Sequence, residues 1–119
     1  MIHHVALEIR EEDGDANVAF WALLGFTEVA VPETLAGKTR WCGRDGTQIH
    51  LLFTDAPDVP PQGHVALVAR DYDAQLKALE RAGFPPEPRA EHWGSARCFV
   101  ATPSGHRVEI MRFAPDDRV

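Results

Sequence analysis

The chain has 119 residues, of which 45% are hydrophobic and 25% charged, a composition typical of one globular domain. Its 12 basic and 18 acidic side chains give a net charge of −6, which disfavours a nucleic-acid partner. No apolar run approaches the roughly 20 residues that cross a bilayer, and no signal-peptide pattern opens the chain. We therefore expect a cytoplasmic protein with no membrane partner. Cys42 and Cys98 lack metal-site spacing and are expected to be free buried thiols.

Several landmarks occur twice in the chain. The run that begins at His4 (His-Val-Ala-Leu) returns 60 residues later at His64, and Gly25-Phe26 returns 58 residues later as Gly83-Phe84. Ordered landmarks at a nearly constant offset predict two copies of one structural unit. We interpret residues 1–119 as a single domain with module one at 1–56, a proline-containing linker at 57–62, and module two at 63–115.

Both modules predict the same order of elements. Each opens with a strand, at His4–Ile9 and His64–Ala69, followed by a helix that ends at a glycine. The first helix is expected to be capped by Asp15 and the second by Asp71 or Asp73. Three short strands complete each module, near 27–31, 39–42 and 47–53 and near 87, 96–101 and 106–113. The predicted fold class is α+β: two βαβββ modules form a curved mixed sheet around a cavity, with the helices outside.

Alternation along the strands places four polar residues on the faces that point away from the helices. Apolar neighbours such as Val5 and Leu7 suit the helix side, which leaves the intervening positions for the opposite face. The four residues at matching positions of the two modules are His4, His50, His64 and Glu109. Imidazole and carboxylate groups are ligands of divalent Zn, Ni, Mn, Fe and Co. A carboxylate in an apolar strand needs a partner or a metal, so Glu109 is the strongest candidate.

Other side chains are weaker candidates. His3 has the opposite parity to His4, so it is left out of the metal set, and His106 is expected to be exposed after a turn. Candidates for substrate binding lie in the third strands and in the loop at 84–96, which is either a lid or a packed irregular loop. They are Trp41, Arg40, Arg97, His92 and Trp93. Trp41 suits either the cavity or the core, and the two arginines suit either an anionic substrate group or solvent.

The paired modules resemble the vicinal oxygen chelate superfamily, which includes glyoxalases, bleomycin-resistance proteins, fosfomycin thiol transferases and extradiol dioxygenases. The resemblance covers about Ile2 to Phe113 and includes the Leu-Gly-Phe helix ending and the Val-Glu-Ile run around Glu109. It implies that His4, His50, His64 and Glu109 hold a divalent metal that chelates two adjacent substrate oxygens. It also implies proton transfer by Glu109, with His50 as its counterpart. His50 departs from the Glu or Gln common there in glyoxalases and epimerases.

Two classes of function remain open. The first is a divalent-metal-dependent, glyoxalase-like lyase, isomerase or transferase that acts on a small oxygen-rich substrate. The second is a bleomycin-resistance-like protein that binds a small molecule or antibiotic without chemistry. A dioxygenase is a lesser alternative, because it generally needs further acid–base groups and His92 is the one obvious candidate. The resemblance implies a homodimer with a small-molecule substrate, and the site lies either within one chain or across two.

Overall fold

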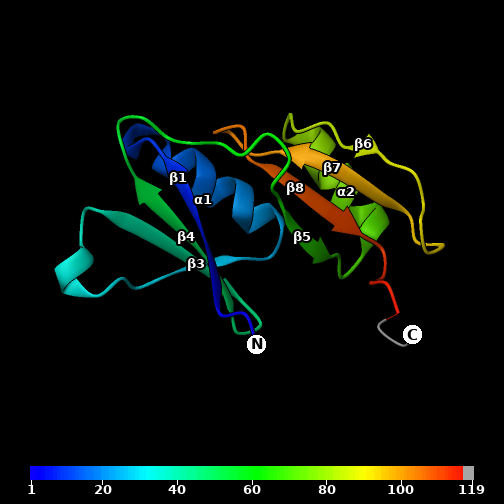
Figure 1. Cartoon of the computed structure of the whole chain (residues 1–119), viewed down its shortest axis with the longest axis horizontal. Coiled ribbons are helices and arrows are strands. Elements are labelled where there is room, and N and C mark those ends of the chain that lie inside the picture. Colours follow the sequence, from blue (N-terminus) through cyan, green and yellow to red (C-terminus); the bar gives the residue numbers. More distant parts are fainter. Residues whose placement is uncertain (117–119) are drawn as a thin grey trace. The chain divides into compact units, whose positions relative to one another are not determined.

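A computed structural model describes residues 1–116, and it confirms the α+β class and the two βαβββ modules (Figure 1). The elements of module one are β1 (His4–Ile9), α1 (Gly14–Leu23), β2 (Thr27–Val29), β3 (Thr39–Arg44) and β4 (Thr47–Phe53). Those of module two are β5 (Val65–Val68), α2 (Tyr72–Arg81), β6 (Glu87–Pro88), β7 (Arg97–Ala101) and β8 (Arg107–Met111). Short 3-10 turns at Glu11–Asp13 and Glu33–Leu35 interrupt module one.

Each module forms a four-stranded mixed sheet of its own. The strand orders are β1-β4-β3-β2 and β5-β8-β7-β6, so the first and last strands of each module lie side by side. These two strands run parallel, and the other neighbours run antiparallel. The same order in both sheets explains why the sequence landmarks repeat.

The helix-facing sides of the sheets form the cores, as alternation predicts. In module one Phe20 and Trp21 of α1 are buried, as are Ile49 and Leu51 of β4. In module two the corresponding residues of β8 and α2 are also fully buried: Val108, Ile110 and Leu79. Burying a side chain of this size contributes about 1.5–3 kcal/mol, so the alternation fixes which face of each strand points away from the helix. Cys42 and Cys98 are free and buried, as predicted.

The helix ends follow the sequence signals with one difference. Gly25 and Gly83 have φ angles of 88° and 89°, the left-handed conformation that ends a helix at glycine. Asp71 caps α2, because its side chain accepts a hydrogen bond from the Ala74 amide at 3.1 Å. The cap that we predicted at Asp15 is wrong. A 3-10 turn precedes α1, so the helix already begins at Gly14 and Asp15 lies in its first turn.

Contacts group the chain into two compact units, Met1–Pro61 with Pro103–His106, and Gln62–Thr102 with the segment that begins at Arg107. The first unit thus includes the tip of the β7–β8 hairpin. There His106 Nε2 donates to the Glu8 carbonyl at 2.8 Å, and Asn17 Nδ2 donates to the Ser104 hydroxyl at 2.9 Å. His106 is therefore buried rather than exposed as expected, because packing of the hairpin tip covers it. No helix in residues 1–116 has the length and apolar character needed to span a membrane.

Candidate functional site

Three rings stack on the face of module one that points away from α1. Trp41 of β3 pairs with His50 of β4, and their ring centroids lie 4.0 Å apart with planes at 4°. The other face of His50 contacts His4 of β1, at a centroid distance of 3.9 Å and an interplanar angle of 11°. The structure therefore places Trp41 on the same face as two of the predicted metal ligands.

His50 is held in a neutral state suited to metal binding. Burial lowers the pKa of His50 below its usual 6.5, and the nearby His4 and His3 lower it further. Its Nε2 lies 2.8 Å from Gln48 Oε1 and donates to it, so Nδ1 keeps the lone pair. A metal ion binds the neutral form of imidazole, and His50 presents that form at neutral pH.

The structure also brings His3 into this cluster, although strand alternation predicted that it points to the opposite face. Strand β1 begins at His4, so the alternation that excluded His3 does not apply to it. His3 Nδ1 lies 3.0 Å from His4 Nδ1. One ligand atom from each of His3, His4 and His50 falls within 4.8 Å of the others. The sequence signal that could have placed His3 in this cluster is its position directly before His4, at the start of a predicted strand.

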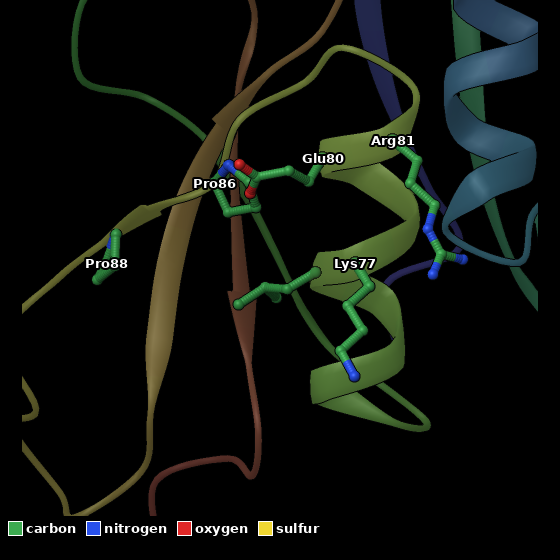
Figure 2. Close-up of a pocket in the computed structure, with 6 residues that line it drawn as sticks. Lys77, Glu80, Arg81, Pro86 and Pro88 are labelled. Carbon is green, nitrogen blue, oxygen red and sulfur yellow. The ribbon is translucent and has the colours of Figure 1, made fainter.

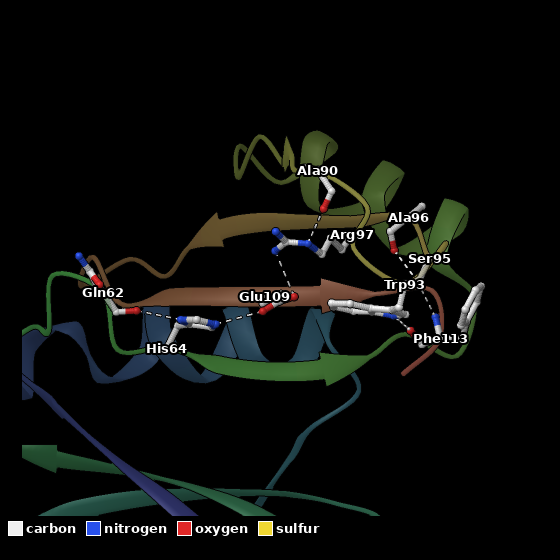
Figure 3. Close-up of polar contacts among 9 residues, drawn as sticks. All are labelled: Gln62, His64, Ala90, Trp93, Ser95, Ala96, Arg97, Glu109 and Phe113. Atoms are coloured by element: carbon white, nitrogen blue, oxygen red, sulfur yellow. Dashed lines mark hydrogen bonds and ion pairs between the residues drawn. The ribbon is translucent and has the colours of Figure 1, made fainter. Parts of the chain in front are cut away.

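In module two the structure brings His64 and Glu109 together (Figure 3). His64 directly precedes β5, and its Nε2 lies 3.0 Å from Glu109 Oε1. Its other ring nitrogen, Nδ1, donates to the Gln62 carbonyl at 2.8 Å. Glu109 is 8% exposed, and its second oxygen accepts from Arg97 Nη1 at 3.3 Å. One histidine and one arginine thus orient a carboxylate within a mostly apolar strand.

The hydrogen bond from His64 to Gln62 determines what can lie between His64 and Glu109. Because Nδ1 carries a proton, Nε2 needs a second proton or a cation between itself and the carboxylate oxygen. Protein metal sites commonly fix a ligand histidine in this way, with its outer nitrogen bound to a carbonyl. Two ligand atoms that share an ion at about 2.1 Å lie roughly 3–3.5 Å apart. The 3.0 Å separation of His64 and Glu109 therefore fits a divalent ion.

Arg40 and Arg97 do not lie at equivalent positions, although each belongs to the third strand of its module. The register pairs Trp41 with His50 and Phe99 with Glu109. The counterpart of Trp41 is therefore Phe99. Arg40 lies one residue earlier in β3, and a shift of one residue reverses the face.

Ion pairs confirm where Arg40 points. Its guanidinium hydrogen-bonds Glu28 and Asp15, and these bonds raise the pKa of Arg40. Asp15 belongs to α1, so Arg40 lies on the helix side of its sheet, away from His50. We expected Arg40 to contact either an anionic substrate group or solvent, and the structure instead pairs its guanidinium with Glu28 and Asp15.

Arg97 and the loop at 84–96 lie on the Glu109 side of module two. Arg97 Nε donates to the Ala90 carbonyl at 2.7 Å, and Trp93 Nε1 donates to the Phe113 carbonyl at 2.9 Å (Figure 3). His92, next to Trp93, is exposed. These bonds tie the loop to β7 and to the residues after β8, which favours a packed irregular loop.

Phe99 is a residue of this face that sequence reasoning missed. Its ring lies 5.2 Å from the ring of His64. Phe99 occupies in β7 the position that Trp41 occupies in β3, beside the strand that carries Glu109 or His50. Residues two apart in a strand share a face, so the candidate Arg97 could have indicated that Phe99 lies on the same face.

A hollow of about 400 Å³ lies elsewhere, between α2 and β6 (Figure 2). It is lined by Leu76, Lys77, Glu80, Arg81, Pro86 and Pro88. None of the predicted site residues lines it, so we do not assign it to the candidate site.

Comparison with known proteins identifies the family. A model of the Glyoxalase/Bleomycin resistance protein/Dioxygenase superfamily matches residues 1–110. The chain belongs to this superfamily. Divalent metals are common among members of the superfamily. No curated protein gives a significant match.

Solved structures share the superfamily fold with this member. A Bacillus anthracis protein assigned to the glyoxalase family matches with a TM-score of 0.85 and 22% identity over 93% of each chain. Lactoylglutathione lyase from Agrobacterium tumefaciens has a TM-score of 0.71 and 23% identity, over 93% of this chain and 92% of its own. A mutant fosfomycin resistance protein from Listeria monocytogenes, in complex with Mn(II) and dihydroxypropylphosphonic acid, has a TM-score of 0.75. Its identity is 16%, over 96% of this chain and 93% of its own, and likeness at these identities shows the fold alone.

Proposed function

We propose that this superfamily member is a divalent-metal-dependent lyase, isomerase or transferase. Its substrate is a small oxygen-rich molecule bound through two adjacent oxygens. The proposed ligands are His4, His50, His64 and Glu109. The observation that carries the proposal is the 3.0 Å approach of His64 Nε2 to Glu109 while Nδ1 is bound to Gln62. The family and the manganese in one structural relative support it.

The proposed ligands of the two modules differ in whether their ligand atoms are already oriented to bind one metal ion. His64 and Glu109 fit an ion as they stand. The rings of His4 and His50 are nearly parallel, and each lone pair lies in its ring plane, so the two cannot point at one ion together. His4 is exposed, so its side chain can leave the stack by rotation. The proposal therefore requires His4 to turn when metal binds.

The chain's own residues supply the proton transfer in this proposal. A bound divalent ion stabilises negative charge on substrate oxygens. Glu109 is the proposed proton-transfer group, because His64 and Arg97 hold its two oxygens in a fixed orientation. His50, neutral and with a lone pair on Nδ1, is the second candidate. Full activity in Glu109→Gln would exclude that role for Glu109.

Metal content of the untagged protein tests the proposal. The chain is loaded separately with Zn, Ni, Mn, Fe and Co, dialysed, and analysed by plasma mass spectrometry. We expect near-stoichiometric retention of at least one ion, and its loss in His64→Ala and Glu109→Ala. His92→Ala, which removes an exposed imidazole from the loop, is the matched control and should retain metal. No metal at any loading would reject the proposal.

A second candidate is non-catalytic capture of a small molecule, and the ring stack of module one favours it. Trp41 and His50 offer a flat aromatic surface if a planar ligand displaces His4. Binding of this kind would survive both chelation and Glu109→Ala. The metal-dependent enzyme would lose substrate binding under either treatment, so the two candidates give opposite results.

We also propose a homodimer whose sites combine ligands from two modules, within one chain or across two. Sedimentation of the purified chain tests the dimer, and a monomer at all concentrations would reject it. Mixing His4→Ala with Glu109→Ala distinguishes the arrangements. If the site is shared across chains, a mixed dimer regains one intact site and binds metal, whereas sites within one chain stay broken.

A further inference from the structure

Three arginines surround Phe99 on the face of module two that bears Glu109. The guanidinium carbons of Arg89 and Arg107 each lie 4.9 Å from the centroid of the Phe99 ring, and that of Arg97 lies 5.6 Å from it. They come from the residue after β6, from β8 and from β7. We call Arg89, Arg97 and Arg107 the arginine cluster. Its charges share one small area beside the proposed ligand Glu109.

These arginines have few acidic partners, although acidic residues outnumber basic ones by 18 to 12 in the chain. Arg97 shares Glu109 with His64, and Arg89 reaches Glu87 only at 3.5 Å. The contact that the structure gives Arg107 within residues 1–116 is the Phe99 ring. Each guanidinium has five N–H donors, so most donors of the cluster have no acceptor among the described residues.

Two arginines elsewhere in the chain are paired differently. Arg40 binds two carboxylates, and Arg112 binds Asp73 through two nitrogens at 2.9 and 3.3 Å. Carboxylates therefore neutralise both Arg40 and Arg112. The three cations of the arginine cluster have only Glu109 and Glu87 as acidic partners among residues 1–116, so the cluster keeps a net positive charge. The Phe99 ring contacts all three guanidiniums without using their N–H groups.

We propose that the arginine cluster binds an anionic group of the substrate, a phosphate, phosphonate or carboxylate, beside Glu109. The proposal rests on the metal-dependent function proposed above and names its substrate class. A planar guanidinium matches two oxygens of such a group, and clustered guanidiniums suit an anion with more than one charge. Binding of the anion also relieves the repulsion among the three cations.

Arg107 is the residue through which the proposal is tested. Arg97 also holds Glu109 and the loop at Ala90, so its removal would disturb the proposed metal site. Within residues 1–116, the Arg107 side chain forms no hydrogen bond with His64 or Glu109, so Arg107→Gln leaves these two ligands intact. The matched control is Arg81→Gln, which removes the same charge from the exposed end of α2.

The experiment titrates the full-length chain with inorganic phosphate and, separately, with malonate, after chelation of metal and at constant ionic strength. Calorimetry and the arginine Nε–Hε NMR signals report binding, and the tighter probe shows whether phosphate-like or carboxylate groups are preferred. We expect Arg107→Gln to weaken that probe about tenfold or more, because it removes charge-assisted hydrogen bonds. Arg81→Gln should change binding by less than about twofold.

Two results would overturn the proposal: wild-type chain that binds neither probe, or equal weakening by the two variants. Metal retention, measured on a metal-loaded and dialysed portion of the same preparation that was not treated with chelator, separates this proposal from the proposed function. A chain that binds phosphate but no ion refutes the metal-dependent function alone. A chain that holds an ion but binds neither probe refutes anion binding alone.

Discussion

Replacing Glu109 separates its structural contribution from its proposed chemical role, because glutamine and alanine leave different partners behind. In Glu109→Gln the amide oxygen can accept from Arg97 while the amide nitrogen donates to Nε2 of His64. That nitrogen can accept, since the proton of His64 already lies on Nδ1 toward Gln62. The variant therefore loses a charge but no hydrogen bond. In Glu109→Ala the Arg97 guanidinium, 11% exposed, loses its only carboxylate among residues 1–116.

The size of each effect follows from these contacts. Breaking a buried ion pair by removing one partner costs about 3–5 kcal/mol. We expect about 3 kcal/mol for Glu109→Ala, because the Arg97 contact is long at 3.3 Å and Arg97 keeps its bond to Ala90. Glu109→Gln loses only charge assistance, about 1 kcal/mol. The two metal-free variants should differ by about 2 kcal/mol, or roughly 8 °C in Tm for a chain of this size.

Urea unfolding followed by circular dichroism, first in chelator and then with the retained metal, measures both effects. Metal at 100 times its Kd should stabilise the wild type by about 2.7 kcal/mol and should stabilise neither variant by a comparable amount. Equal stability of the two variants in chelator would refute the contribution of the Arg97–Glu109 pair. Metal stabilisation of Glu109→Gln equal to that of the wild type would refute Glu109 as a ligand.

The further predictions concern two buried titratable groups, His50 and Cys42. His4→Gln should raise the pKa of His50 while leaving it below 6.5, because burial, its main cause, remains; NMR titration of the imidazole signals measures this, and a fall would contradict it. Since the folded state disfavours the charged form of His50, unfolding takes up a proton below about pH 6.5, and stability falls as pH drops toward the folded pKa. His50→Gln should flatten this part of the stability–pH curve. Burial raises the pKa of the Cys42 thiol to about 11, so iodoacetamide at pH 8 should react slowly with it in the folded chain and quickly in urea; equal rates would contradict this.

The sequence predicted the fold well because its repeat and its strand alternation are both local signals. Alternation placed Ile49 and Val108 on the helix side and His50 and Glu109 on the opposite face. In the structure Ile49 and Val108 are fully buried in the cores, as this placement predicts. The sequence did not show which residues of the third strands are equivalent in the two modules. Counterparts lie 58 to 60 residues apart, as with Trp41 and Phe99, whereas Arg40 and Arg97 lie 57 apart. This difference of one residue places Arg40 on the helix side of its sheet and Arg97 on the opposite face of its own.

Two histidines show where local reasoning ends. His3 was excluded by a rule that applies within a strand, but β1 begins one residue later. His106 was expected to be exposed because it follows a turn, yet a hydrogen bond to Glu8 buries it. The partner of His106 lies 98 residues away in the sequence, and no local pattern carries that information.

The two modules share a backbone plan but carry different chemistry on equivalent faces. Trp41 stacks on a neutral imidazole, whereas its counterpart Phe99 contacts guanidiniums.

The remaining question is which donors hold the metal. Each module contributes two of the four proposed ligands, and a catalytic zinc site uses about three protein ligands, so neither pair suffices alone. Three imidazoles of module one, with His3 as the third, would satisfy that number without Glu109 once His4 turns out of the ring stack. Metal kept in Glu109→Ala but lost in His3→Ala would place the ion there, and the opposite result would favour the ligand set that spans both modules.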